Sequence, residues 1–412
     1  MNTIADVVVI GSGIIGASIS HELARHGVDS VIAVDKGAGP AEGSTGSSSA
    51  FCRCRYSRSE LVTMAHEGRE LYGDWAAYTG LENPRSELKR PGLVWMLGWD
   101  RERTVADAER LADHGVEVSV LDAEGLSGRY PYLNPCGEDF DLTGEIEHEC
   151  KPAEAFIVEE RSGYADPSGA NQDLVEAARN RGAEVRFSSP VTGLLRQGDA
   201  VSGIELADGS RIDAGLVINA AGPWCNRINE MAEVDLEWHL TPTRVQVIYR
   251  GLPPEMKSLP LVGDFSTGIY FRPESEGQQV LVGSVLAEDE EEIVNDPDDF
   301  KKSADASYTE MKLAALHHRI PSLEARGLPT GIAGLYTINR EDVHPVLGPV
   351  GREGFWVANG FSGHGFKLAP VIGSMIAQAY TGETIDRDTV MSMDFFSVDR
   401  EPLLTEAKNV LA

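Results

Sequence analysis

The chain has little positive charge and no long apolar run. Its 412 residues include 36 Lys and Arg against 65 Asp and Glu, a formal net charge of −29. Such a negative field repels phosphate backbones and anionic lipid head groups, which argues against a nucleic-acid partner. No apolar stretch approaches the roughly 20 residues that a membrane-spanning helix needs, so the sequence predicts no integral membrane segment.

Cysteine is scarce and follows no pattern. The five cysteines include no Cys-x-x-Cys pair, and Cys52-Arg53-Cys54 has the wrong spacing for a zinc knuckle. With an odd number of scattered cysteines and no visible secretory signal, we expect a reducing compartment, no disulfide framework and no metal site. The sequence therefore predicts a cytoplasmic protein.

Glycine, by contrast, is abundant. The chain has 43 glycines, well above the roughly 7% of an average protein, so many backbone segments must turn tightly or approach another group closely. A typical domain has about 150 residues, so the length predicts two to three domains, each able to bury a sizeable core.

The first motif is a glycine-rich turn after an apolar run. Residues 4–10 predict a buried strand, and GSGIIG follows at once. Gly11 permits the tight turn, Gly13 lets the backbone approach a pyrophosphate, and Gly16 lets the next helix pack on the strand. A second strand ends at Asp35, which can accept hydrogen bonds from a ribose diol. This order predicts a dinucleotide site but does not separate FAD from NAD.

The remainder of the dinucleotide domain lies far along the chain. Residues 169–181 read as a helix, 183–187 as a strand, and 214–222 as an apolar strand that runs into Trp224. An interrupted dinucleotide domain is typical of large flavoproteins. The organisation therefore favours FAD over a nicotinamide cofactor.

Three segments carry a family resemblance: GSGIIG with VDK near the N-terminus, GSTGSSSAFCRCRY at 43–56, and the stretch from GLYTINREDVHPVLGPV to GFSGHGFKLAPVIG at 334–373. Together they resemble the FAD-dependent D-amino-acid oxidase superfamily, most closely its sarcosine oxidase and dimethylglycine dehydrogenase branch. The resemblance implies an α/β fold of mixed α+β character, with a Rossmann-like FAD-binding domain interleaved with a substrate domain on a mainly antiparallel sheet. The implied ranges are 1–85, 150–225 and 331–412 for the first domain, and 86–149 and 226–330 for the second.

The closing motif makes sense without the family. Three glycines at 360, 363 and 365 lie between an expected strand (355–358) and an expected helix (370–380). Such a turn offers backbone N–H groups and a positive dipole end, which suit the N1–C2=O edge of a reduced flavin. Lys367 would add a positive charge there; the alternative is a solvated surface lysine. We interpret His364 as a flavin contact and His344 as a residue that positions the turn.

The resemblance implies non-covalent FAD. Monomeric sarcosine oxidases attach FAD through a cysteine at the position where this chain has Gly334, so no thiol is available there. The residues expected to contact FAD are Gly11, Ser12, Gly13, Ile14, Ile15, Gly16, Asp35, Lys36, Gly43, Ser44, Thr45, Ser49, Val191, Ala221, Gly222, Trp224, Gly360, Gly363, His364, Gly365, Phe366 and Lys367.

The family holds its substrate carboxylate between a lysine of the closing motif and an arginine from the early part of the chain. Lys367 matches the lysine, and Arg53 is the best match for the arginine, with Arg55 as the alternative. Arginine suits this role because its planar fork grips a carboxylate through two hydrogen bonds. The other implied catalytic residues are tyrosines of the substrate pocket: Tyr56, Tyr270 and Tyr336.

The implied reaction removes a hydride equivalent from the carbon next to an amine nitrogen, and the imine product then hydrolyses. The expected substrate is a small secondary or tertiary amine amino acid such as sarcosine, dimethylglycine or a longer N-methylamino acid; a D-amino acid or proline-type substrate is the alternative. A non-catalytic flavin-binding subunit is the alternative of another class.

The electron acceptor could be O₂, a quinone or an electron-transfer protein. Related oxidases place a lysine over the flavin where this chain has Leu281, and residues 258–300 contain no lysine. A cation there would stabilise developing superoxide, so its absence favours a dehydrogenase over an oxidase. The acidic run from Glu288 to Asp299 reads as a solvated loop, with a docking surface for a basic electron carrier as the alternative. An oligomer is compatible with the sequence.

Overall fold

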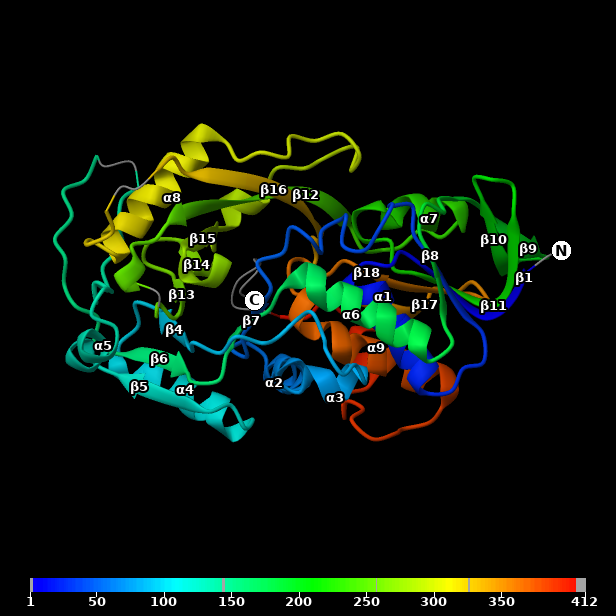
Figure 1. The fold of residues 1–412 in the computed structure, drawn as a ribbon, viewed down its shortest axis with the longest axis horizontal. Helices are drawn as coiled ribbons and strands as arrows, with labels where there is room; N and C mark the ends of the chain where they lie inside the picture. The colour runs from blue at the N-terminus through cyan, green and yellow to red at the C-terminus, as the bar shows by residue number, and fades with distance from the viewer. Residues whose placement is uncertain (1–2, 143–144, 257, 325–326, 405–412) are drawn as a thin grey trace.

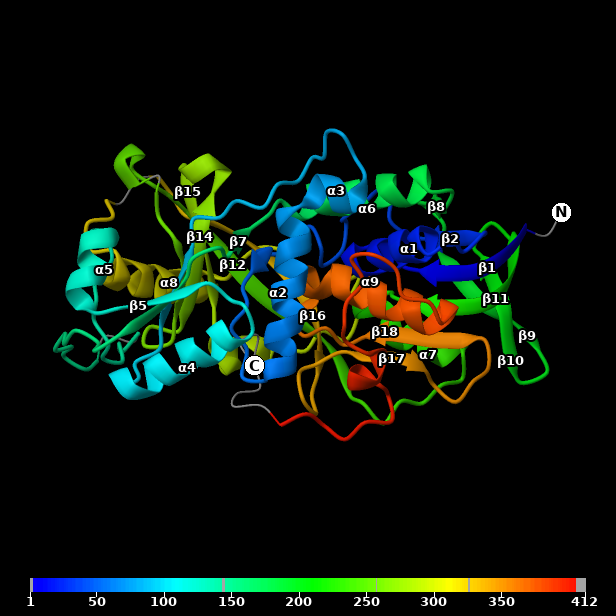
Figure 2. The same cartoon turned by 90° about the horizontal axis from the view of Figure 1, so that it is seen from below.

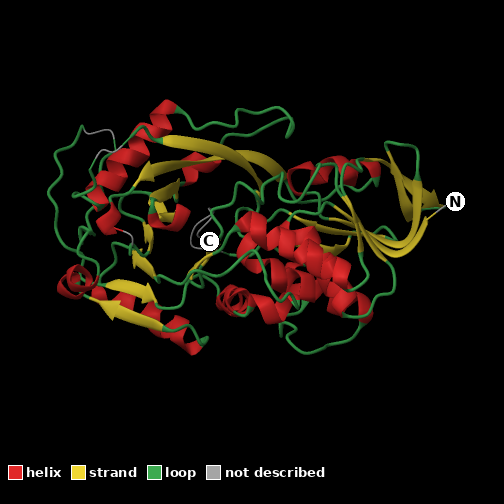
Figure 3. Ribbon diagram, in the orientation of Figure 1, coloured by secondary structure: helices red, strands yellow, loops and turns green. Residues whose placement is uncertain are grey.

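The computed structural model describes residues 3–142, 145–256, 258–324 and 327–404. It has two parts that lie side by side, each built on an eight-stranded sheet (Figure 1). The N-terminal strand and most of the helices belong to one part, as the colouring in Figure 3 makes plain. The fold class predicted from the sequence, a mixed α/β architecture with one largely parallel and one mainly antiparallel sheet, is confirmed.

The first sheet has the strand order β17-β18-β11-β1-β2-β8, and the β9–β10 hairpin extends from β11. Neighbouring strands from β18 to β8 are parallel. The strands are β1 (Thr3–Ile10), β2 (Val31–Val34), β8 (Glu184–Arg186), β9 (Val191–Gln197), β10 (Ala200–Leu206), β11 (Arg211–Asn219), β17 (Val346–Pro349) and β18 (Phe355–Asn359).

The central strand β1 is buried on both faces from Val7 to Ile10, which explains the apolar run in its second half. Val7 and Val9 pack in the core beneath helices α1 and α9, whereas Val8 and Ile10 pack on the other face, against β10 and α7. The helices of this part are α1 (Ile14–Arg25), α2 (Ser59–Gly73), α3 (Trp75–Thr79), α6 (Pro167–Asn180), α7 (Cys225–Met231) and α9 (Gly365–Thr381).

The second sheet has the order β16-β12-β15-β14-β13-β4-β6-β5, and its neighbours are antiparallel except for β13 and β4. One face packs against helix α8, and the other faces the first part. Its elements are β4 (Leu93–Met96), β5 (Val118–Leu121), β6 (Phe156–Glu159), β12 (Leu240–Gly251), β13 (Leu261–Asp264), β14 (Ile269–Glu274), β15 (Gln279–Ser284) and β16 (Thr330–Asn339), with helices α4 (Arg101–Asp113), α5 (Ala123–Arg129) and α8 (Ala306–Arg319).

The strands of the two sheets do not follow the domain boundaries predicted from the sequence. Strand β6 pairs with β4 and β5, and β16 pairs with β12 along its whole length, so both belong to the second sheet. The predicted division had placed these residues with the FAD-binding segments, within 150–225 and 331–412. The assignment of the two parts to FAD and substrate stays a prediction, and its ends at 1–2 and 405–412 lie outside the described residues.

Short elements join the two parts. Helix α2 lies between them in the view of Figure 2, and β3 (Phe51–Cys52) pairs with β7 (Gly163–Tyr164). The 3₁₀ turns are Gly222–Trp224, Pro254–Met256, Ser275–Gly277, Ala287–Glu290 and Met393–Phe396. In the described part of the chain, no helix has both the length and the apolar character to cross a membrane.

Helix α9 begins at Gly365, five residues before Pro370, so the predicted start of this helix at Pro370 was wrong. Proline cannot donate to the carbonyl four residues before it, so it usually marks a helix boundary. Here that carbonyl belongs to Phe366, and it accepts a hydrogen bond from the Tyr72 hydroxyl at 2.8 Å. The tertiary contact replaces the lost bond, and Lys367 therefore lies in the first turn of α9 rather than in the preceding loop.

Candidate active site

The glycine-rich turn packs too closely for side chains. Gly11 has a φ of 98°, and a Cβ there would lie 2.5 Å from the carbonyl oxygen of Ala220. A Cβ on Gly16 would lie 1.8 Å from the carbonyl oxygen of Gly11. Glycine is therefore required at both positions, as the predicted motif needs, and the ends of β1 and β11 meet beside the start of α1.

Unpaired polar groups gather at this helix start. Helix α1 begins after Gly13 without a side-chain cap, and the Ile14 N–H donates to the Thr45 hydroxyl at 3.0 Å. The hydroxyl oxygens of Ser12 and Ser44 are buried with no hydrogen-bond partner among the described residues. Buried polar atoms are rarely left unpaired, and a helix N-terminus favours an anion. These groups fit the pyrophosphate of FAD.

Asp35 lies where a ribose would be recognised. Its carboxylate accepts hydrogen bonds from the backbone N–H groups of Ser12 and Gly37, each at 2.7 Å. The backbone of residues 188–189 bonds to the same segment, which brings the start of β9, and with it Val191, close to Asp35. Lys36 lies over the Trp224 ring, 3.9 Å from its centroid. The structure thus brings together the predicted residues from four segments of the chain.

The start of α9 lies next to the start of α1. A Cβ on Gly365 would be 3.6 Å from the Cδ1 atom of Ile15, so two helix N-termini point their positive ends at one region. Phe366 itself packs in the core, stacked on Tyr72 at 5.0 Å between ring centroids. Only its backbone is available to a cofactor, because its side chain is committed to the core.

Arg53 and Lys367 come together at Tyr56. The guanidinium carbon of Arg53 and the ammonium nitrogen of Lys367 lie 4.0 and 5.7 Å from the centroid of the Tyr56 ring. All three side chains are buried. Burial, followed by the charge of Arg53, holds the pKa of Lys367 well below its ordinary value of 10.5. Burial also raises the pKa of Tyr56 to about 12, so its hydroxyl is protonated at neutral pH.

Arg55 points to a different partner. Its Nε atom lies 2.7 Å from a carboxylate oxygen of Asp107, and its guanidinium covers the Trp99 ring at 4.9 Å from the centroid. Arg53, by contrast, donates to the Arg55 carbonyl and lies beside Lys367. Of the two arginines that the sequence left open, the geometry supports Arg53.

Two histidines stack behind this group. His364 lies 3.1 Å from the Tyr56 hydroxyl through Nδ1, and burial, then the charge of Lys367, keeps its pKa well below 6.5. The His344 ring lies parallel to the His364 ring, with 5.5 Å between centroids. The backbone carbonyl of His344 accepts from the Asn339 side chain at 2.7 Å, so a role of the His344 side chain in positioning the turn stays a prediction. His364 is therefore neutral, in keeping with a contact role rather than a cationic one.

Sequence reasoning missed the residue that holds the arginine segment in place. Glu159, at the end of β6, is fully buried, and its carboxylate accepts from the backbone N–H groups of Cys54 and Arg55, both at 2.8 Å. It also accepts from the Trp95 indole at 2.7 Å and from the Ser162 hydroxyl. A lone glutamate in an apolar strand carries no motif, so only the pairing of β6 with β4 reveals it.

Tyr270 and Tyr336 form a second group. Both are buried or nearly so, and they line one cavity together with Ser49, Tyr308 and Gly334. Tyr308 is an addition that the sequence did not indicate. A Cβ on Gly334 would lie 2.6 Å from the Ser47 Cβ, so even a cysteine there would need Ser47 to move.

Strand β3 connects the two groups. The Phe51 ring packs edge-on against Tyr270, with 5.1 Å between centroids. Arg53 follows two residues later and lies with Lys367 at Tyr56. The segment of residues 51–56 therefore connects Tyr270 with Arg53, Tyr56 and Lys367.

Leu281 is buried in β15, opposite Tyr249 on one side and Arg272 on the other. Residues directly opposite in a sheet share a face, so Arg272 is the cation nearest in register. Arg272 pairs with Glu274 at 2.7 Å and donates to the Ser49 carbonyl at 2.6 Å. Its charge is thus already compensated.

The acidic run is exposed for the most part, in keeping with the interpretation as a solvated loop, but some of its acids also form ion pairs. Asp289 pairs with the buried Lys312 at 2.7 Å, and Glu292 pairs with the buried Arg244 at 2.6 Å. Farther on, Asp298 pairs with Lys36 and accepts from the Trp224 indole at 3.0 Å. These contacts connect the run to both parts of the protein.

Comparison with known proteins identifies the fold and the cofactor. A family model described as "FAD dependent oxidoreductase" (DAO) matches residues 6–379. The chain is 26% identical over 97% of its length to FAD-dependent oxidoreductase domain-containing protein 1 of Xenopus laevis, of which it covers 84%. It is 28% identical over 93% of its length to the monomeric sarcosine oxidase of Streptomyces avermitilis, of which it covers 96%.

Other relatives are longer or more distant. Mouse dimethylglycine dehydrogenase is 25% identical over 90% of this chain, which spans 42% of that protein. Among solved structures, L-proline dehydrogenase from P. horikoshii superposes with a TM-score of 0.79 at 23% identity, covering 97% of this chain and 98% of that one. At that identity the likeness establishes the fold.

Proposed function

Because the chain belongs to the FAD-dependent oxidoreductase (DAO) family, we propose that it oxidises a small secondary or tertiary amine amino acid at the carbon next to nitrogen. Bound FAD supplies the two-electron acceptor for such a reaction. The site fits FAD, because the unpaired hydroxyls of Ser12 and Ser44 and the uncapped start of α1 meet at one place. Ser12, Thr45, Asp35 and the first turn of α9 would hold it.

The observation that carries the proposal is the pair of buried cations at Tyr56. Lys367 and Arg53 are buried together, and burial, followed by the charge of Arg53, lowers the pKa of Lys367. An anion that joins two neighbouring buried cations stabilises both of their charges. A substrate carboxylate would be that anion, with the planar guanidinium of Arg53 gripping it and Lys367 adding a point charge.

The same residues would orient the substrate. Arg53 and Lys367 would form a carboxylate clamp. A carboxylate bound there holds the adjacent carbon at a constant distance from these two residues, so the protein would accelerate the reaction mainly by orienting the substrate. The two cations also disfavour a protonated amine nearby, which lowers the cost of presenting the neutral amine. Tyr270 and Tyr336 would form the wall on the side of the second sheet. The imine product would hydrolyse to an amine and an aldehyde or oxo acid.

We further propose that the protein is a dehydrogenase rather than an oxidase. Leu281 is apolar and buried, and the cross-strand cation Arg272 is paired with Glu274. A site without an uncompensated cation stabilises superoxide poorly. A quinone or an electron-transfer protein would then reoxidise the flavin.

Anaerobic bleaching of the bound flavin tests the substrate class. Purified protein would be mixed with sarcosine, dimethylglycine, longer N-methylamino acids, D-alanine and D- and L-proline in separate titrations. We expect one of the N-alkylated amino acids to bleach the 450-nm band fastest, the band position being an approximate property of flavins in general. Fastest bleaching by proline or a D-amino acid would move the substrate to the alternative class. No bleaching by any amine would favour a non-catalytic subunit.

A further inference from the structure

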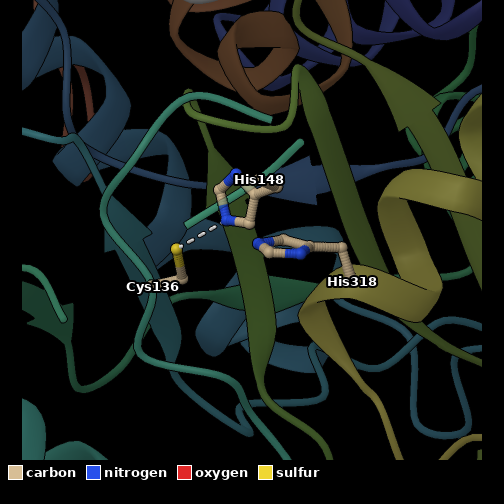
Figure 4. A group of neighbouring side chains, drawn as sticks. All are labelled: Cys136, His148 and His318. Carbon is tan, nitrogen blue, oxygen red and sulfur yellow. Dashed lines mark hydrogen bonds between the residues drawn. The ribbon is translucent and has the colours of Figure 1, made fainter. Parts of the chain in front are cut away.

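Three metal-ligating side chains meet in the second part of the protein, away from the site at Tyr56. The ligand atoms of Cys136, His148 and His318 all lie within 4.8 Å of one another (Figure 4). The Cys136 sulfur is 3.3 Å from Nε2 of His148, and the two imidazole rings are perpendicular, with 4.6 Å between centroids. No sequence motif indicates this group, because Cys136 and His318 are far apart in the chain.

Cys150 is the candidate for a fourth ligand. Its side chain is exposed and its sulfur lies 3.5 Å from the side-chain oxygen of Asn134, which also accepts from the Cys136 backbone N–H at 3.2 Å. The His318 Nε2 atom is buried and has no hydrogen-bond partner among the described residues. An imidazole nitrogen left without a partner beside a thiol and a second imidazole is available to a metal ion.

The backbone holds these residues at one point. Residues 130–155, between α5 and β6, contain no helix or strand in their described portion, and loops of more than about 12–15 residues without such structure are uncommon. Cys136 lies on one limb of this loop and His148 and Cys150 on the other, and the limbs meet at a bridge between Cys136 and Pro152. Arg319, next to His318, donates to the Cys136 carbonyl at 2.9 Å. Helix α8 thus anchors the loop.

The spacing suits zinc. Zinc bonds of about 2.3 Å to sulfur and 2.0–2.1 Å to nitrogen, at tetrahedral angles, separate the two ligand atoms by about 3.6 Å. The observed distance between Cys136 sulfur and His148 nitrogen is 3.3 Å. Two sulfur and two nitrogen ligands are a set that a structural zinc site uses. The other cluster of this kind, Glu22 with His26 and Asp388, already surrounds the guanidinium of Arg25.

We propose that Cys136, His148, Cys150 and His318 form a structural zinc site that fastens the loop of residues 130–155 to the end of helix α8. The ion would bond to both limbs of the loop and to the helix at once. It would replace the Cys136–His148 hydrogen bond with bonds to the metal. All four coordination positions are filled by protein, so the site is closed and takes no substrate.

Metal analysis of the intact flavoprotein tests the proposal. The protein would be expressed with added zinc, purified without chelators, and analysed by plasma mass spectrometry together with its FAD content. We expect about one zinc ion per chain, and zinc K-edge absorption spectra with two sulfur neighbours at about 2.3 Å and two nitrogen neighbours at about 2.0 Å. Because metal content is read without any substrate, this result is independent of the amine-oxidising proposal.

Variants at adjacent histidines give a matched control. His318→Ala should lose the zinc, whereas His317→Ala, which removes the neighbouring histidine of the same helix end, should keep it; both should retain FAD. If His318→Ala does not fold, the metal content and absorption spectrum of the unmodified protein still decide. Zinc at background level in that protein, or a Cys136–Cys150 disulfide found by peptide mapping, would overturn the proposal.

Discussion

Arg53 and Lys367 approach the same aromatic ring, that of Tyr56, from segments more than 300 residues apart. Their charged ends lie 4.0 and 5.7 Å from its centroid, measured from the guanidinium carbon and the ammonium nitrogen. The ring faces stabilise both cations, but their proximity in a buried place keeps the pKa of Lys367 low. A bound carboxylate would therefore stabilise the charges of both Arg53 and Lys367.

The lowered pKa of Lys367 predicts how carboxylate affinity depends on pH. A carboxylate binds the protonated form of Lys367. Its affinity is therefore highest at pH values below the pKa of Lys367 in the free protein and falls at higher pH. Because that pKa lies below 10.5, the fall should begin at a lower pH than for an exposed lysine, with a limiting slope of about tenfold per pH unit. Acetate, which this reaction cannot oxidise, would be titrated into the protein at a series of pH values. Its affinity would be measured from the change in the flavin spectrum.

Two variants give the comparison for this pH dependence. Lys367→Arg should remove the alkaline limb, because arginine stays protonated throughout the range. Lys302→Ala, a change at an exposed lysine, should leave the profile as it is. An alkaline limb that persists in Lys367→Arg would assign the titration to another group.

The Glu159 carboxylate should be essential to stability. It accepts four buried hydrogen bonds, from Cys54, Arg55, Trp95 and Ser162. In Glu159→Gln, the amide hydrogens of the glutamine would face some of these donors. Breaking a buried charged network lowers the free energy of unfolding by about 3–5 kcal/mol. Urea unfolding should show a loss of that size. Glu160→Gln, which removes the partly exposed ion pair with Arg129 and leaves the amide oxygen to accept from the Ser119 hydroxyl, should change stability by about 1 kcal/mol or less. Equal effects would refute the role given to Glu159.

FAD should be released intact on denaturation. Gly334 offers no thiol, and a Cβ at that position would already meet Ser47. Acid precipitation should therefore leave all of the yellow colour in the supernatant, with FAD identified there by chromatography. Flavin that stays with the washed pellet would show a covalent bond at another residue.

Leu281 should limit the reaction with oxygen. The reduced protein should be reoxidised faster by an artificial dye than by air-saturated buffer, because the apolar side chain offers developing superoxide no charge partner. Leu281→Lys should raise the oxygen rate without changing the rate at which substrate reduces the flavin. The isosteric Leu281→Met should change neither rate. Rapid stoichiometric peroxide formation by the unmodified protein would contradict the dehydrogenase assignment.

The sequence predicted best where the signal was local. The turn from Gly11 to Gly16 and the acid at Asp35 lie within one short strand–helix–strand unit, and Gly11 and Gly16 make the close backbone contacts that the motif requires. The family match confirmed FAD. The placement of Lys367 followed from the glycines around it, although the extent of the helix did not.

The failures share one physical cause, which is a partner from a distant segment. The Tyr72 hydroxyl lets α9 run through Pro370. Glu159 meets the arginine segment only because β6 joins β4 in the second sheet. The zinc-ligand cluster depends on His318 in the same way. No periodicity or short motif encodes such contacts.

The central claim is that Arg53 and Lys367 hold the carboxylate of an amine substrate. The most direct measurement compares anaerobic flavin reduction by sarcosine with reduction by dimethylamine, which is sarcosine without its carboxylate, in the unmodified protein and in Lys367→Met. Charge-assisted hydrogen bonds of about 1.5–3 kcal/mol predict a preference for sarcosine of roughly ten- to a hundredfold or more, and a much smaller preference in the variant. If another N-methylamino acid bleaches the flavin faster than sarcosine, the same comparison applies to that amine and its decarboxylated analogue. Equal reduction by the two amines, or a preference that Lys367→Met leaves unchanged, would contradict the claim that these two residues hold the carboxylate.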